Sequence, residues 1–228
     1  MNYFNSTSLA FILITCTTVL LFYLASHKNS KALGLIFLYL LTQGLLAYFS
    51  FYSVQPLNPI KVPMVVVPSF ILVFYLLLST KGRTFTQSLN LKTLTLLHTI
   101  RVPVELILFL LCTQKLIPEI MTFEGRNFDI VAGLTAPIIY YLAFIKNKIG
   151  PKGLLAWNMI CLGLLINIII HAVLSTEIPF QQFGLDQPNP AILQFPYIWL
   201  PTVVVPIVFF SHCVAIKRLL KMKPKDSN

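Results

Sequence analysis

The chain has 228 residues, of which 57% are hydrophobic and 11% charged, and its net charge is +10. Its mean hydropathy of +0.80 excludes a soluble globular domain, because a soluble core of this size needs far more polar surface. We therefore expect a membrane protein with several spans, whose main partner is the lipid bilayer. The basic residues stand in short clusters between apolar segments, as in membrane proteins, so we expect no nucleic-acid partner.

Seven apolar segments follow one another along the chain. Each has close to the ~20 residues that a helix needs to cross about 30 Å of hydrocarbon. The segments are residues 5–26, 32–54, 61–80, 91–112, 129–146, 153–174 and 196–218. The sequence therefore predicts an all-α integral membrane protein, a bundle of seven transmembrane helices.

Basic residues accumulate on one side of these segments, after the first, third, fifth and seventh. They are Lys28, Lys31, Lys81, Arg83, Lys92, Lys146, Lys148, Lys152, Lys217, Arg218, Lys221, Lys223 and Lys225. Loops rich in Lys and Arg stay in the cytoplasm. We therefore expect the N-terminus outside and the C-terminus inside a bacterial inner (cytoplasmic) membrane, with the basic tail held near anionic lipids.

The two halves of the chain share three short patterns in the same order. The matched pairs are residues 23–29 with 141–147, Gly34 and Gly44 with Gly153 and Gly163, and residues 63–68 with 201–206. Such agreement indicates an internal repeat of three helices. We expect a first three-helix repeat over residues 1–83, a central linking helix over 84–112, and a second three-helix repeat with a cationic cytoplasmic tail over 113–228.

A single linking helix between two three-helix units makes the repeats parallel. This 3+1+3 plan resembles that of the SWEET sugar transporters and their PQ-loop relatives, in which two three-helix bundles enclose a pathway. The Pro-Gln dipeptide of that family is missing from the first, second and fifth segments, so the resemblance implies the plan alone. No binding residue is transferred from it.

The central segment carries His98, Arg101 and Glu105 in its middle third. At ~100° per residue these three side chains lie within about 60° of one another on a helix. Each Arg or acidic residue at the centre of a membrane helix costs about 2.5–3.5 kcal/mol, so the stripe should face a protected polar interior. The i, i+4 spacing allows Arg101 to pair with Glu105, and Pro103 should distort the helix between them.

Two interpretations of this stripe stay open. Arg101 and Glu105 either form a buried ion pair that locks helix packing, or bind a ligand and relay protons. In the second case Arg101 receives an anionic or polar ligand, and Glu105 is its counter-ion or a proton carrier. Asn167 and His171 share one face of the sixth segment and, with Asp129 at the start of the fifth, are candidates for an outward-facing polar vestibule.

His98 and His212 fall at similar depths in the cytoplasmic third of two antiparallel segments. Two such histidines are the minimum for bis-imidazole ligation of haem b, or part of a metal site. We predict no resident cofactor, since each histidine can instead satisfy a buried hydrogen bond or relay a proton. The haem and metal interpretations are kept as alternatives.

The favoured function is a transporter or facilitator of a small polar or anionic solute, through a cavity lined by the central helix. The alternative is an intramembrane enzyme, or a haem or metal redox protein that uses His98 and His212. HExxH and serine–histidine motifs are missing from the sequence, so we assign no catalytic residue and lean against an enzyme. A non-catalytic subunit of a membrane complex and a homo-oligomer also stay open.

Overall fold

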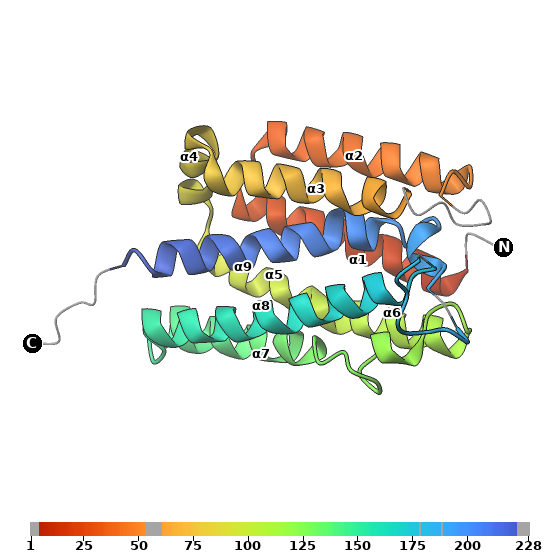
Figure 1. The fold of residues 1–228 in the computed structure, drawn as a ribbon. Coiled ribbons are helices and arrows are strands. Elements are labelled where there is room, and N and C mark those ends of the chain that lie inside the picture. The colour runs from red at the N-terminus through yellow and green to blue at the C-terminus, as the bar shows by residue number, and fades with distance from the viewer. Residues whose placement is uncertain (1–4, 53–60, 178, 188, 223–228) are drawn as a thin grey trace, which may run out of the picture.

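The computed structural model describes residues 5–52, 61–177, 179–187 and 189–222. It is all-helical, with 75% of its residues in helices and no strand within those ranges. The long helices lie side by side in one elongated bundle, and the chain enters and leaves it at opposite ends (Figure 1). Residues 53 and 54 of the second predicted segment, and Lys223 and Lys225 of the predicted tail, lie outside the described residues.

Nine α-helices make up the described part of the bundle. They are α1 Ser6–Ala25, α2 Ser30–Tyr48, α3 Lys61–Leu78, α4 Thr80–Ser88, α5 Leu91–Leu97, α6 Arg101–Thr113, α7 Ile130–Tyr140, α8 Pro151–Leu174 and α9 Val205–Leu219. Short 3₁₀ or π turns join or extend some of them. These are η1 His98–Ile100, η2 Glu119–Met121, η3 Tyr141–Ile145, η4 Ala191–Leu193 and η5 Leu200–Val204.

Several helical stretches are long and apolar enough to cross a membrane. Five described stretches pass on their own, namely Ser6–Ala25, Ser30–Tyr48, Leu91–Thr113, Pro151–Leu174 and Leu200–Leu219. Pro63–Leu78 passes only together with Thr80–Ser88, from which it is bent by 86°, and Ile130–Ile145 is a shorter apolar helix. The helices are therefore compatible with a membrane protein that has several transmembrane helices.

The bend between α3 and α4 is built into the sequence. Ser79 caps α4, because its hydroxyl accepts a hydrogen bond of 3.0 Å from the N–H of Gly82. A Cβ at Gly82 would lie 2.5 Å from the Cα of Leu76, closer than real Cβ contacts come. Glycine is thus required where α4 folds back against the end of α3.

Prolines lie within or close to three of the irregular turns. Pro103 has no N–H for the carbonyl of Thr99, and the 3₁₀ turn η1 between α5 and α6 ends three residues before it. The sequence predicts a distortion at Pro103, between Arg101 and Glu105, but α6 is continuous there and the 3₁₀ turn lies earlier, at His98–Ile100. The π turn η5 contains Pro201 and precedes Pro206, and η3 follows Pro137.

The continuous stretch α5–η1–α6 and the stretch η5–α9 lie deepest in the bundle. α1 packs along α5 and α6, α7 packs on η1, and α8 packs along α9. The apolar core between them contains fully buried side chains such as Phe11, Leu97, Leu111 and Val214. Polar side chains on these central helices are consequently shielded from lipid and water.

Candidate functional site

Arg101, at the start of α6, forms a buried ion pair with Asp129, the residue just before α7. Its side chain is almost fully buried, its Nε donates to Asp129 Oδ2 at 2.5 Å, and its Nη2 donates to Asp129 Oδ1. This two-point contact is the strong form of a carboxylate–guanidinium pair. The expected pairing of Arg101 with Glu105 is wrong, because α7 presents a better-placed carboxylate from outside the helix.

Gly133 lets α7 come close enough for this pair. A Cβ at Gly133 would lie 2.7 Å from the backbone nitrogen of Val102 and 3.2 Å from the Cβ of Arg101. Only a residue without a side chain fits that close an approach. Gly133 stands about one helical turn after Asp129, so the contact fixes the depth at which the carboxylate meets the guanidinium.

The guanidinium of Arg101 also makes polar contacts with α8 and α9. Arg101 Nη2 donates to the carbonyl of Cys161 at 3.3 Å, and Nη1 lies 3.1 Å from His212 Nε2. Since a guanidinium only donates, Nε2 of His212 accepts. The hydrogen of the imidazole then lies on Nδ1, which donates to Asn158 Oδ1 at 2.9 Å, while Asn158 Nδ2 donates to the carbonyl of Leu154 at 2.9 Å.

His98 joins the cluster through its ring. It stacks on His212 with the centroids 3.8 Å apart and the planes 10° from parallel. Trp157 packs against both imidazoles, at 5.6 Å from His98 and 5.9 Å from His212. Nδ1 of His98 and Oγ1 of Thr99 are buried with no hydrogen-bond partner among the described residues.

The stacked arrangement bears on the haem and metal hypotheses. Axial ligation requires two imidazole nitrogens facing each other across an iron, whereas these two rings lie face to face in contact. In the part of the chain that the structure describes, no three His, Cys, Asp or Glu residues are grouped so that they could hold a metal ion. The contact of His98 with His212 is therefore not the arrangement that bis-imidazole ligation requires.

Glu105 lies one turn further along α6 and has an amide as its partner. Both carboxyl oxygens accept from Asn127 Nδ2 at 2.7 Å, and this nitrogen also donates to the carbonyl of Met121 at 3.0 Å. Oδ1 of Asn127 accepts from the backbone N–H of Asp129 at 3.0 Å. Among the described residues, the recorded ion pair is that of Arg101 and Asp129, so Glu105 is a buried carboxyl without a cation.

Glu105 and Asp129 also line one small cavity. Its volume is about 90 Å³, and it lies between α3, α6, α8 and η5. Its other walls are mostly apolar, with Val66, Phe70 and Leu165 among them. A cavity of this size has room for more than one water molecule, and the two carboxyls are the groups that would hold water there.

The whole polar cluster lies within a stretch that matches a known family. The model of a Domain of unknown function (DUF8737) matches residues 59–220, well over half of the chain. The chain belongs to the DUF8737 family. The matched region includes every residue of the cluster, from His98 to His212. No curated protein and no solved structure matches the chain.

Asn167 and His171 lie apart from this cluster in the DUF8737 fold. Asn167 Nδ2 donates to the carbonyl of Arg126 at 2.8 Å, and His171 Nδ1 lies 2.8 Å from the carbonyl of Asn167. The imidazole of His171 stacks on Phe183 at 5.3 Å. Both residues thus hold loops against α8, and neither is hydrogen bonded to Asp129. The predicted shared vestibule is replaced by a buried Asp129 that faces Arg101.

Sequence reasoning missed Asn127 and Asn158, which complete the network. Asn158 is an amide inside an apolar helix, as Asn167 is, so the sequence carries the same signal at both positions. Asn127 stands two residues before Asp129, in a loop where amides are common, so its sequence carries no such signal.

Proposed function

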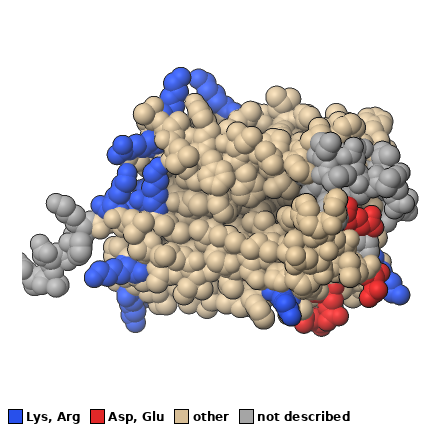
Figure 2. All heavy atoms as spheres, in the orientation of Figure 1, with Lys and Arg blue, Asp and Glu red and all other residues tan. Residues whose placement is uncertain are grey.

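We propose that this DUF8737 protein crosses a bacterial inner membrane seven times, with its N-terminus outside and its C-terminus inside. Most Lys and Arg side chains gather at the end where α9 ends, and Asp and Glu side chains at the opposite end, which supports this orientation (Figure 2). The shortest span, Ile130–Ile145, rises about 24 Å, a mismatch that local thinning of the bilayer accommodates. The 3+1+3 parallel repeat stays part of the proposal and is supported by the three aligned sequence patterns.

Within that frame, the proposed function is proton-coupled transport of a small anion. The observation that carries it is a buried Arg101–Asp129 pair with a second carboxyl, Glu105, on the same cavity and without a cation of its own. A buried carboxyl without a positive partner is the group best suited to hold and release a proton.

The coupling follows from charge balance. A proton passed from Glu105 to Asp129, directly or through water in the cavity, neutralises the partner of Arg101, and a proton taken up from outside then restores the neutral acid form of Glu105. The guanidinium then needs another counter-ion, and its fork of donors suits a carboxylate or phosphate. One proton and one monovalent anion would enter together, so the buried cluster never carries an unpaired charge.

The test is uptake into proteoliposomes under an imposed pH gradient. Labelled small carboxylates and phosphate are supplied outside, and a pH-sensitive dye inside reports proton entry. We expect Glu105→Gln to abolish proton entry with the anion, because an amide cannot carry the proton. The matched control is Glu119→Gln, the same change at an exposed carboxyl, which should leave uptake unchanged.

Two results of the uptake assay would contradict the proposal. One is uptake no faster than in protein-free vesicles for every anion supplied. The other is equal proton entry in the Glu105 and Glu119 variants. A steady proton leak without any anion would instead assign the cluster to proton conduction alone and exclude coupling.

The apolar walls of the cavity favour a second candidate, an intramembrane enzyme for a lipid-like substrate. Here Glu105 would act as the acid or base on an amphipathic molecule lying against Val66 and Leu165. Incubation with membrane lipids followed by mass spectrometry of the products tests this candidate. A product formed by the unchanged protein and not by Glu105→Gln would establish it.

A further inference from the structure

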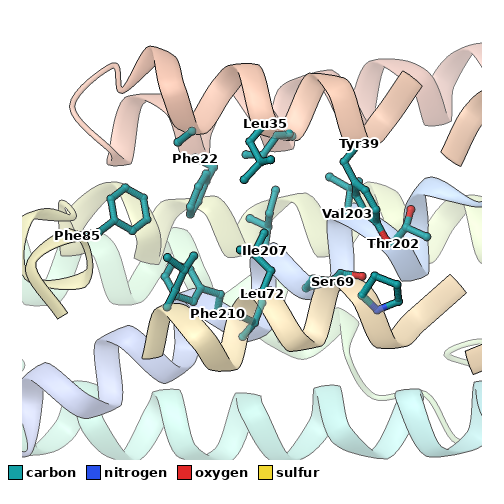
Figure 3. A pocket seen from close by; sticks show the side chains of 16 residues that line it. Phe22, Leu35, Tyr39, Ser69, Leu72, Phe85, Thr202, Val203, Ile207 and Phe210 are labelled. Carbon is teal, nitrogen blue, oxygen red and sulfur yellow. The ribbon is translucent and has the colours of Figure 1, made fainter. Parts of the chain in front are cut away.

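An apolar groove runs along the outside of the bundle, between α2, α3 and α9. Its volume is about 190 Å³, and Figure 3 shows Leu35 and Tyr39 of α2 facing Leu72 of α3 across it, with Ile207 of α9 behind. From Ser69 to Leu76 its α3 wall rises about 10 Å. Half of a 30 Å hydrocarbon core is about 15 Å, so this wall covers about two thirds of one leaflet and can hold part of one acyl chain.

A cluster of positive charge adjoins one end of this groove. Arg83 of α4, with Lys217 and Arg218 of α9 and Lys221 just beyond it, lines a second pocket of about 180 Å³. The same helices wall both spaces. On α4, Phe85 lines the groove and its neighbour Thr86 lines the basic pocket. On α9, Phe210 lines the groove and Val214, one turn later, lines the basic pocket.

Two of these cations are held in place by backbone carbonyls. Lys217 Nζ donates to the carbonyl of Leu77 in the last turn of α3, and Arg218 Nη1 donates to the carbonyl of Leu89 just after α4. Carbonyls at helix ends lack partners within the helix, so they are natural acceptors for such side chains. Both cations are therefore positioned before any ligand arrives.

No described carboxylate balances this charge. The ion pair recorded in the described residues joins Arg101 to Asp129, and the visible acidic side chains lie at the other end of the bundle (Figure 2). Positive charges gathered around one pocket, beside an apolar groove, fit a molecule with an anionic head and an apolar tail.

We propose that this surface binds an anionic phospholipid, with its phosphate on Arg83, Lys217, Arg218 and Lys221 and one acyl chain in the groove. The α4 helix, at 86° to α3, lies where the head group meets the chains, as an interfacial helix does. Arg and Lys are the usual phosphate ligands. The site is separate from the proton-linked cluster and does not depend on its function.

The experiment is native mass spectrometry of the delipidated full chain in a neutral detergent, with phosphatidylglycerol or phosphatidylcholine of equal chain length added. We expect one retained phosphatidylglycerol per chain and weaker retention of phosphatidylcholine. The double variant Arg83→Gln, Lys221→Gln should reduce phosphatidylglycerol retention about 30-fold, since each cation near an anionic head group contributes about fivefold.

The matched control is Lys148→Gln, Lys152→Gln, which removes one exposed positive charge just before α8 and one in its first turn, away from the groove. It should retain the lipid as the unchanged protein does. Filling the groove with Ala32→Phe should instead weaken both lipids, because the chain and not the head group is displaced.

Three outcomes would overturn the site. Equal loss in the two double variants would mean general attraction to positive charge. Unchanged retention in Ala32→Phe would remove the acyl chain from the groove. A dimer that persists after lipid removal and is broken by Ala32→Phe would make a second copy of the chain the occupant.

Discussion

Two helical stretches of the bundle are both apolar enough to span a membrane, yet they sit in different surroundings. In the central stretch Leu91–Thr113, 61% of the spanning window is buried inside the protein, while in α2, Ser30–Tyr48, only 17% is. The central stretch carries His98, Arg101 and Glu105, and α2 presents exposed leucine and phenylalanine instead. Position in the bundle, and not apolar character, decides which helix can carry charge.

The physical reason lies in what surrounds each side chain. Around Arg101, carboxylate, imidazole and carbonyl groups replace water, so the charge is paired and hydrogen bonded. Leu38 of α2 is 62% exposed, and in a membrane it would meet lipid, which is as apolar as the leucine itself. Three single substitutions and one double variant can break or sharpen this contrast.

The largest effect is expected from Asp129→Ala. It leaves the guanidinium of Arg101 buried without its counter-ion, and breaking a buried pair in this way costs about 3–5 kcal/mol of unfolding free energy. Thermal or denaturant unfolding of the purified protein in detergent measures it. Asp186→Ala removes an exposed carboxylate and should change the unfolding free energy by less than about 0.5 kcal/mol.

A double variant separates charge from shape. Arg101→Met with Asp129→Leu removes both charges, and apolar replacements of a buried pair are often neutral in stability. We expect it to be more stable than Asp129→Ala alone. Were the double variant the less stable of the two, the pair would be holding the helices by geometry and not by charge balance.

The sequence predicts the stripe on the central helix, but not its partners. Hydropathy and helical spacing depend on neighbours in the chain, and they correctly mark Arg101, Glu105 and His98 as residues that face inward. Which carboxylate meets Arg101 depends on how closely α7 approaches. That approach is decided by Gly133 and Val102, which are far apart in sequence and carry no periodic signal.

The sequence indicates that His98 and His212 can meet, because their depths on two antiparallel helices are similar. Whether two helices touch is a matter of packing, and here η1 and α9 do bring the rings together. Asn167 shows the limit of the same reasoning. Its depth and chemistry match those of a site residue, yet its amide holds the carbonyl of Arg126.

The second single substitution, Gly133→Ala, tests whether α7 must lie this close to Val102. One added methyl group would meet Val102 and force α7 away from Arg101, and such overpacking costs about 1–3 kcal/mol. Gly163→Ala is the matched control in α8, where nothing lies within 4 Å of the added Cβ. There alanine should stabilise the helix by up to about 1 kcal/mol. Equal stability of the two variants would mean that α7 can shift without loss.

The smallest effect is expected on α2, from Leu38→Ala. In a membrane, the unfolded reference state retains its helices in lipid, so Leu38 faces the same surroundings before and after folding. The unfolding free energy should therefore change by less than about 0.5 kcal/mol. The same substitution at Leu97, which is fully buried, removes contacts that lipid does not replace and should cost about 2 kcal/mol or more. A large loss at Leu38 would show that α2 is covered by protein, and would favour a second copy of the chain on that face.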